Sequence, residues 1–337
     1  MATGTVQSFL VPNYSGLLYN KANTNTPFLN SISGRVKYTQ SVEFVCGQYY
    51  TSEEGDIPAI SETASLTAPT ATYVTRTPMT NVTQIFHETI GISYAKESNM
   101  NTLSGANIAG QVANPINELD FQTSQKMDKI KRSIEKAFIQ GTYNEANSDA
   151  TINKTRGMLA AITTNVVSAQ SGSGQSATNA PLDLWLVNDA VKKIKESGGE
   201  IDNLIMLVNA TNLLQLHGNA VELGMKVGEP YMNTFGIQVR DVLLPIGAVV
   251  RVGLGEFLPD GTALIYNPRV CGPVEQPVPG KGNFFREELA KTGAGEQYQI
   301  FGQIGLDHGP EWYHAKITGL STTFTKPAGL AVKTVNA

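Results

Sequence analysis

The sequence predicts an α+β fold with two regions of different character along its 337 residues. Three observations support this prediction. One long amphipathic helix, over 114–141, stands among strand-like segments. A linker rich in Ser, Gly and Ala, over 168–180, is followed by alternating helix and strand patterns of the α/β kind. Strand-like segments at 297–306 and 313–317 then close the chain, and their best partner is the strand candidate 82–94, so the α/β part is expected to be an insertion.

The long helix carries both start and stop signals. Asn114 is a good N-cap, and Pro115 suits the first helical position. Apolar or small residues recur at helical spacing on one face: Ile116, Leu119, Thr123, Met127, Ile130, Ile134, Ala137 and Phe138. Gly141 follows where a left-handed C-cap is expected. At 1.5 Å per residue this helix is about 39 Å long, which suits a brace better than a pocket wall.

Composition and charge exclude several classes of protein. Hydrophobic residues make up 41% of the chain, which predicts a globular core, but charged residues make up only 16%, against a usual value of about 25%. Such a surface suits a protein covered by neighbours, and it equally suits a plain Thr/Asn-rich β protein. With 25 basic and 29 acidic residues and no extended basic cluster, tight nucleic-acid binding is not expected.

Two cysteines, Cys46 and Cys271, lie too far apart in sequence to define a disulfide framework. Residues 1–10 lack the basic start and apolar core of a secretory signal. No apolar run reaches the length that spans a membrane, so no membrane partner is expected. The sequence therefore predicts a protein made and kept in a reducing cytoplasm.

The first 80 residues divide into an arm and an excursion. Residues 1–40 are polar and loosely patterned, and they suit either an extended arm or a floppy terminus. Short alternating segments at 42–45 and 71–74 flank a turn-rich centre that contains Gly55, Pro58 and Pro69. This pattern predicts a long two-stranded excursion with an irregular tip over 41–80.

The composition of the excursion suggests how it is held. Residues 41–75 contain five acidic residues and no Lys or Arg. Ordering this backbone costs on the order of 35–70 kcal/mol, while each exposed ion pair contributes about 0–1 kcal/mol. Burial of apolar side chains can meet that cost, either on a neighbouring subunit or on the chain's own domain. The basic face of the long helix, otherwise a solvated surface, is long enough to receive the acids. The candidate inter-subunit contacts are therefore Glu53, Glu54, Asp56, Tyr49, Tyr50, Ile57, Ile60, Lys129, Arg132 and Lys136.

The α/β part is expected to combine two helices with several buried strands. Residues 181–197 and 211–217 have helical patterns, and 204–208 is a continuous apolar run typical of a buried strand. Three further strand candidates follow, with a Pro-Asp-Gly turn at 259–261 between them: 237–244, 248–254 and 263–266.

The usual catalytic and cofactor motifs are missing or incomplete. His87-Glu88 opens like a zinc-protease motif, but Gly91 stands where the second histidine is required. His308 and His314 flank a turn beside Asp307, a common arrangement that does not by itself define a metal site. Gly172 and Ser173 do not have nucleophile-elbow spacing. We therefore predict no catalytic residue, no metal site and no cofactor.

The order of these parts, together with local sequence, resembles the major capsid protein of tailed bacteriophages, which has the Hong Kong 97 fold. The helix end Ile130-Lys-Arg-Ser-Ile-Glu-Lys-Ala-Phe-Ile-Gln-Gly141 is similar to the close of that family's spine helix, and Arg156-Gly-Met-Leu159 to the segment after it. Glu288-Leu-Ala-Lys-Thr-Gly293, running into Gln299-Ile-Phe-Gly-Gln-Ile-Gly-Leu306, is similar to the C-terminal strand of one branch.

The resemblance implies a division of the chain and a structural role. The implied parts are an N-terminal arm (1–40), an extended loop over the adjacent subunit (41–80), a peripheral domain (81–155 and 285–321) with its spine helix at about 115–140, an axial domain (156–284) and a C-terminal tail (322–337). Such a chain forms hexamers and pentamers of an icosahedral or prolate head shell around double-stranded DNA. It is assembled in the host bacterial cytoplasm with a portal and, in some members, scaffolding or decoration proteins.

Two departures from the family pattern bear on assembly. About 40 residues without helical pattern precede the excursion, so removal of a long scaffold segment by a protease is not expected. No lysine lies between Lys37 and Lys96, so the loop cannot supply the lysine cross-link of one branch. We expect a shell without covalent links. A ladder of bonded multimers on a denaturing gel of mature particles would refute this.

Three other functions stay open from the sequence. An encapsulin compartment has the same fold and holds protein cargo in place of nucleic acid. A hydrolase would use His308 or His314 and would lose activity when either is replaced. Another virion part, such as a tail protein, would form tubes or rings, which electron microscopy distinguishes from closed shells.

Overall fold

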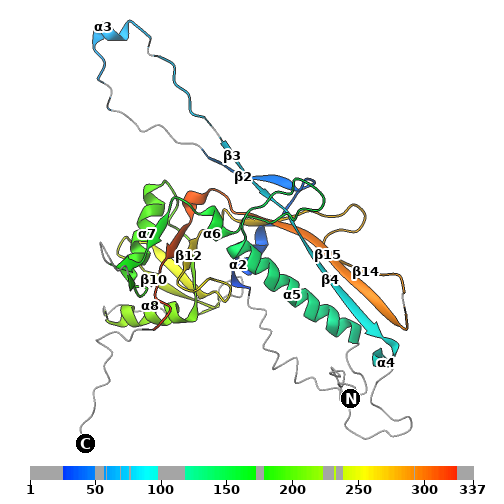
Figure 1. Ribbon diagram of the computed structural model, residues 1–337. Coiled ribbons are helices and arrows are strands. Elements are labelled where there is room, and N and C mark those ends of the chain that lie inside the picture. Colours follow the sequence, from blue (N-terminus) through cyan, green and yellow to red (C-terminus); the bar gives the residue numbers. More distant parts are fainter. Residues whose placement is uncertain are drawn as a thin grey trace, which may run out of the picture.

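The structure is a computed structural model that describes residues 26–49, 57, 59–68, 70–75, 77–97, 118–171, 178–222, 231–232, 238–291 and 293–324. Two β-sheets form the body, and a two-stranded hairpin projects from it (Figure 1). Within the described residues, no helix combines the length and apolarity needed to cross a membrane.

The first sheet is built on one long antiparallel ladder. Strand β4 (Gln84–Ser93) pairs with β15 (Gly295–Asp307) from Gln84↔Ile304 to Ser93↔Gly295. The pairing of 82–94 with 297–306 predicted from sequence is confirmed. The other edge of β15 holds two strands in turn, and β13 also pairs in parallel with β1. These strands are β13 (Gly272–Glu275), β14 (Phe285–Glu288) and β1 (Lys37–Tyr38).

The long helix α5 (Glu118–Gln140) lies along this ladder (Figure 1). Its 23 described residues make it about 35 Å long. Ile130, Ile134 and Phe138 are buried in the same core cluster as Phe86 and Ile90 of β4. The helical stripe predicted from sequence therefore meets the alternating stripe of a strand, while Asn114 and Pro115 lie outside the described residues.

The second sheet has seven strands, with helices α7 (Leu184–Glu196) and α8 (Ala210–Glu222) as its two long helices. Strand β8 is buried at all five positions, because Met206 faces one core cluster while Ile205 and Leu207 face the cluster that contains α5. Its continuous apolar run is thereby explained. The strands, in order across the sheet, are β5 (Val166–Ser168), β16 (Ala315–Thr318), β12 (Ala263–Tyr266), β8 (Leu204–Val208), β11 (Val249–Leu254), β10 (Gln238–Leu243) and β9 (Tyr231–Met232).

The hairpin consists of β2 (Glu43–Tyr49) and β3 (Thr77–Val82), with the short helix α3 (Glu62–Ser65) at its far end (Figure 1). The predicted antiparallel excursion is present, with a register shift at Cys46. The second strand is not at 71–74, however. Residues 71–75 have no regular structure, because the ladder ends at Tyr49↔Thr77 and Tyr73, 88% exposed, has no core to pack on.

The second half of the predicted arm is neither extended nor floppy. Residues 27–38 form helix α2 (Pro27–Ile32), a 3-10 turn η1 (Ser33–Arg35) and strand β1. Phe28 and Ile32, one helical turn apart, are fully buried in the core cluster that contains α5. The apolar pair therefore fixes this segment on the body, whereas residues 1–25 lie outside the described residues.

Two further expectations are wrong. Segment 313–317 does not pair with 82–94: β16 joins β12 and β5 in the second sheet, because Ala315 and Ile317 face that core. With β13 in the first sheet, the two sheets exchange strands across the predicted boundary at 284 and 285.

Gly141, at the end of the long helix, is not a left-handed cap. Its hydrogen atom is needed because a Cβ would lie 2.5 Å from the carbonyl oxygen of Thr155.

The remaining described elements are short. Helix α8 extends the predicted 211–217 segment in both directions. The short elements are α4 (Tyr94–Glu97), α6 (Met158–Ala161), β6 (Gln170–Ser171), β7 (Thr178–Asn179) and the 3-10 turn η2 (Glu311–Tyr313).

Candidate assembly site: the hairpin and the junction beneath it

The hairpin exposes large apolar side chains far from the body. Ile57 is 95% exposed, Leu66 85% and Tyr73 88%, and Ile60 is also exposed. Burying one such side chain stabilises a structure by about 1.5–3 kcal/mol. Within the described residues, the subunit does not provide a surface for these groups, so the alternative that the hairpin packs on its own domain is wrong for them.

The other predicted hairpin contacts are only partly described. Tyr49 ends strand β2, but its side chain is not described, and Tyr50, Glu53, Glu54 and Asp56 lie outside the described residues. Their part in a subunit contact stays a prediction. Of the acidic residues on the excursion, Glu43 and Glu62 are described, and both are exposed.

The basic face of α5 is partly neutralised within the subunit. Glu88 of β4 binds Lys126, at 2.9 Å, and Lys129. Although burial alone would raise the pKa of Glu88, the two ammonium groups hold it below its usual value. Lys129 is therefore already paired. Arg132 is half-buried, and Lys136 is exposed and forms no ion pair within the described part of the chain.

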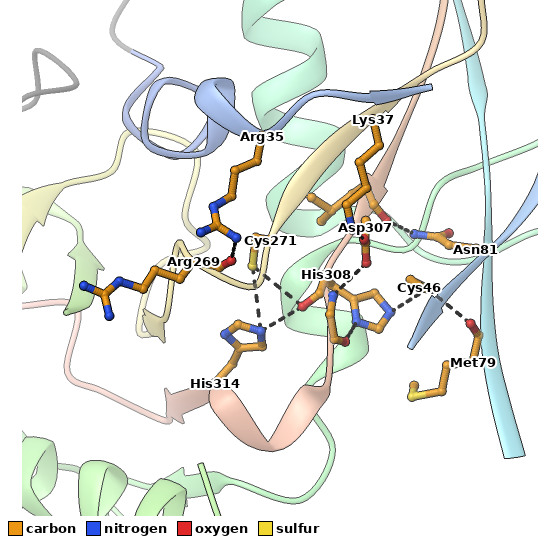
Figure 2. Close-up of polar contacts among 12 residues, drawn as sticks. Arg35, Lys37, Cys46, Met79, Asn81, Arg269, Cys271, Asp307, His308 and His314 are labelled. Atoms are coloured by element: carbon orange, nitrogen blue, oxygen red, sulfur yellow. Dashed lines mark hydrogen bonds and ion pairs between the residues drawn. The ribbon is translucent and has the colours of Figure 1, made fainter. Parts of the chain in front are cut away.

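Beneath the hairpin, residues 307–314 carry the chain from the first sheet to the second. Figure 2 shows the polar groups that gather around this crossing segment from the arm, from the hairpin root and from Cys271, just before β13. Gly309, with φ of 62°, reverses the backbone there, and its N–H donates to Asp307 Oδ1 at 3.0 Å. Asp307 also binds Lys37 of the arm through Oδ2.

His308 links the crossing segment to the hairpin root. Its Nδ1 lies 2.7 Å from the carbonyl oxygen of Gly309, which can only accept, so Nδ1 carries the proton. Its Nε2, which carries no proton, lies 3.5 Å from Sγ of Cys46 on β2, and the same thiol lies 3.5 Å from the carbonyl oxygen of Met79. Burial lowers the pKa of His308, which keeps the ring neutral. The bulge at Cys46 thus aims the thiol at the body.

His314, at the other end of the segment, has the opposite tautomer. The backbone N–H of Asn267 donates to its Nδ1 at 3.3 Å, so Nε2 carries the proton and donates to the carbonyl oxygen of His308 at 2.8 Å. Cys271 Sγ lies 3.7 Å from the same Nε2. Burial lowers the pKa of His314 to about 3.

Asn81 and Glu311 fix the surrounding backbone. The Asn81 amide donates to the carbonyl oxygens of Leu306, at 2.7 Å, and Arg156, at 3.1 Å. Its Oδ1 accepts from the N–H groups of Arg156, at 2.7 Å, and Val82, at 2.9 Å. Glu311 Oε2 accepts from the backbone N–H of Thr163 at 2.6 Å. Nothing in the sequence around Asn81 indicates its partners Arg156 and Leu306, because they lie far away along the chain.

This junction has the properties of a structural network. His308 and His314 are fully buried, so a substrate cannot reach the two residues on which a hydrolase would depend. Burial raises the pKa of Cys46 to about 12 and that of Cys271 still further, so both thiols stay protonated. Among the described residues, no group of three or more His, Cys, Asp or Glu side chains has the geometry of a metal site.

Comparisons with known proteins agree with this reading. The sequence matches the SU10 major capsid protein family over residues 1–321. A search of curated protein sequences finds no match. The fold is similar to the capsid of cyanophage A-1(L), with a TM-score of 0.62, 11% identity and coverage of 96% of this chain and 98% of that one.

Two other solved structures have the same fold. The capsid of cyanophage P-SCSP1u matches with a TM-score of 0.51, 10% identity and coverage of 86% of each chain. The SrpI encapsulin of Synechococcus elongatus PCC 7942 matches with a TM-score of 0.55, 11% identity and coverage of 97% of this chain and 95% of that one. With a Hong Kong 97-type fold, an incompletely buried hairpin and a family match over almost its whole length, this chain belongs to the SU10 major capsid protein family and is a structural protein of a phage capsid shell.

Proposed function

We propose that the hairpin lies on a neighbouring copy of the same chain, and that this contact assembles hexamers and pentamers into an icosahedral or prolate head shell. The observation that supports the proposal most strongly is the exposure of Ile57, Ile60, Leu66 and Tyr73 on a projecting element. In a shell of identical subunits, each hairpin finds the same apolar surface on its neighbour. The acidic residues Glu53 and Glu54 then select the register, because complementary charges favour one alignment over others.

The proposal also assigns parts of the chain to regions of the shell. The hairpin is the extended loop, the first sheet with α5 is the peripheral domain, and the second sheet is the axial domain around the five-fold and six-fold axes. The shell encloses double-stranded DNA without binding it tightly, in keeping with a net charge of −4. A portal and, where present, scaffolding or decoration proteins complete assembly in the host bacterial cytoplasm, and the finished chain resides in the virion.

The test separates assembly from folding. Replacing Ile57 and Tyr73 together by Ser should leave the subunit folded, with an unchanged melting temperature, but should abolish closed shells in electron micrographs. Ile152→Ser is the matched control, because Ile152 is 65% exposed on the body and its loss should not affect shell yield. Normal shells from the double variant would overturn the proposal.

Reversing the charge of Glu53 and Glu54 tests their role separately from that of the apolar side chains. Glu53→Lys combined with Glu54→Lys should leave the subunit folded and lower the shell yield, whereas Glu256→Lys, on the body, should not. If both charge variants form shells at normal yield, the acids do not select the register.

An encapsulin-type compartment is the second candidate, because the SrpI encapsulin has the same fold over nearly the full length of both chains. The contents of purified shells distinguish the two. Nuclease-protected double-stranded DNA supports the phage head, and a co-purifying protein cargo without nucleic acid supports the compartment.

A further inference from the structure

A buried carboxyl group on α5 holds the start of helix α2. Glu135 is fully buried, and its Oε1 accepts from the backbone N–H of Phe28 at 2.8 Å. Its Oε2 accepts from the backbone N–H of Leu29 at 2.7 Å. Within the described residues, Glu135 forms no ion pair. One carboxyl group thus receives two N–H groups of a helix that lies more than a hundred residues earlier in the chain.

Helix α2 depends on this distant residue because it has no cap of its own. Thr26, at the N-cap position, makes no side-chain hydrogen bond to the first turn, and Pro27 has no N–H. A helix of six residues is not stable by itself in water. The two N–H groups that a local cap would satisfy are instead satisfied by Glu135.

The same helix also binds the second sheet. Tyr266 of β12 lies 2.8 Å, between hydroxyl oxygens, from Ser31, which itself donates to the carbonyl oxygen of Phe28 at 2.7 Å. The Tyr266 hydroxyl is therefore the donor to Ser31. The rings of Phe28 and Tyr266 are 4.9 Å apart. Helix α2 thus contacts the spine helix and the seven-stranded sheet at once.

Residues after α2 continue to the junction beneath the hairpin. Arg35 donates to the carbonyl oxygen of Arg269, Lys37 binds Asp307, and β1 pairs with β13. We propose that residues 26–38 form a strap closed across both sheets, that Glu135 is the positioning residue that holds it, and that the strap closes more firmly in acid than at neutral pH.

The pH dependence follows from the surroundings of Glu135. Burial raises its pKa to about 7, although the N–H groups of Leu29 and Phe28 lower it in part. Among the described residues, the ionisable group coupled to it is the Tyr266 hydroxyl, whose pKa burial and Glu135 both raise. Helix α2 carries no ionisable side chain, and on α5 the adjacent Lys136 is exposed and Arg132 is half-buried.

The sign of the effect follows from linkage. The closed strap binds a proton at Glu135 more tightly than the open strap, in which the carboxyl group has its ordinary pKa of about 4.3. Raising the pH from about 4.3 to about 7 therefore favours the open form, and above pH 7 the balance between the two forms no longer changes with pH. In the open form Asp307 of the crossing segment loses its ion pair with Lys37.

Hydrogen exchange of the full-length, unassembled chain tests this inference, whether or not the chain forms DNA-filled shells. The opening constant of residues 26–36, corrected for intrinsic exchange, should rise by up to about tenfold per pH unit between pH 5 and 7 and then level off. Glu135→Gln should raise opening at pH 5 and remove the pH dependence, since an amide does not titrate. Asp128→Asn, a matched change on the same helix, should leave the wild-type profile unchanged.

A second variant keeps the inference testable if Glu135→Gln does not fold. Ser31→Ala removes the link to Tyr266 but leaves the carboxyl group, so it should raise opening several-fold at every pH with the wild-type slope. A flat wild-type profile, or a Glu135→Gln profile with the wild-type slope, would overturn the inference.

Discussion

Tyr73 and Asn81 belong to the same hairpin but have opposite surroundings. Tyr73 is 88% exposed near the far end, whereas Asn81, at the root, is fully buried and makes four hydrogen bonds. The root is complete within one subunit, and the far end is not. A hydrogen-bonded root with an exposed apolar far end suits a subunit that assembles with copies of itself.

This difference separates two kinds of stability. Groups at the junction, such as His308 and Glu311, stabilise the subunit, because each has partners from a distant part of the same chain. Groups on the far part of the hairpin, such as Ile57 and Leu66, are exposed in the described part of the subunit, and under the proposed function they stabilise the assembly. Substitutions in the two regions should therefore change different measurements, namely the free energy of unfolding for the junction and the yield of shells for the hairpin.

The largest effect on subunit stability is expected at Asn81. Asn81→Ala removes the partner of two carbonyl oxygens and two N–H groups, of which the carbonyl of Leu306 and the N–H of Val82 are buried, and should lower the free energy of unfolding by more than about 3 kcal/mol. Asn147→Ala, at an exposed position, is the control and should change it by less than about 0.5 kcal/mol. Denaturant unfolding measures both. An equal loss of unfolding free energy in both variants would mean that the junction does not stabilise the subunit.

A smaller and pH-dependent effect is expected at His314. Its pKa is about 3 in the folded subunit and about 6.5 when unfolded, so the unfolded chain binds the extra proton between these values. The contribution to stability is complete above pH 6.5 and falls by up to about 1.4 kcal/mol for each unit below it, until about pH 3. Unfolding curves from pH 4 to 7 should therefore be less steeply pH-dependent in His314→Gln than in the wild type. If stability depends on pH equally in the variant and the wild type, the conclusion that the His314 ring is buried and neutral would be contradicted.

The smallest effect is expected on the basic face of α5. Lys129→Ala removes one of two lysines from Glu88, and since Lys126 remains, the free energy of unfolding should fall by less than about 1 kcal/mol. Lys131→Ala, on the exposed face, is the control. A loss above about 2 kcal/mol from Lys129→Ala alone would place this face among the groups that stabilise the subunit, and would weaken its proposed part in receiving a neighbour's hairpin.

Much of the fold could be predicted because its signals are local. The apolar stripe of α5 and the alternation in β4 each fix a face without knowledge of the partner, and the two faces then meet. The apolar run 204–208 likewise indicates a strand buried on both sides. The exposure of Ile57 and Ile60 on the subunit could also be predicted, because a turn-rich excursion offers apolar residues little surface of its own; their contact with a neighbour stays a prediction.

The rest depends on contacts between distant segments. Periodicity does not indicate which sheet receives 315–318, since Ala315 and Ile317 would alternate equally well in either. Nor does it connect Glu135 with Phe28, although the Pro27 start and the Phe28–Ile32 spacing are a local signal for α2. The prediction for Gly141 failed because a close backbone approach and a left-handed cap both require glycine.

The most direct test of the central claim is protection of the hairpin on assembly. A Glu-specific protease should cut dilute subunits after Glu62, which is exposed in α3, and should leave the buried Glu135 intact. In assembled shells the cut at Glu62 should be slowed by at least about tenfold, because a neighbouring copy covers the hairpin. Resistance of Glu62 in dilute, compact monomers, or equal cutting in monomers and shells, would contradict the account.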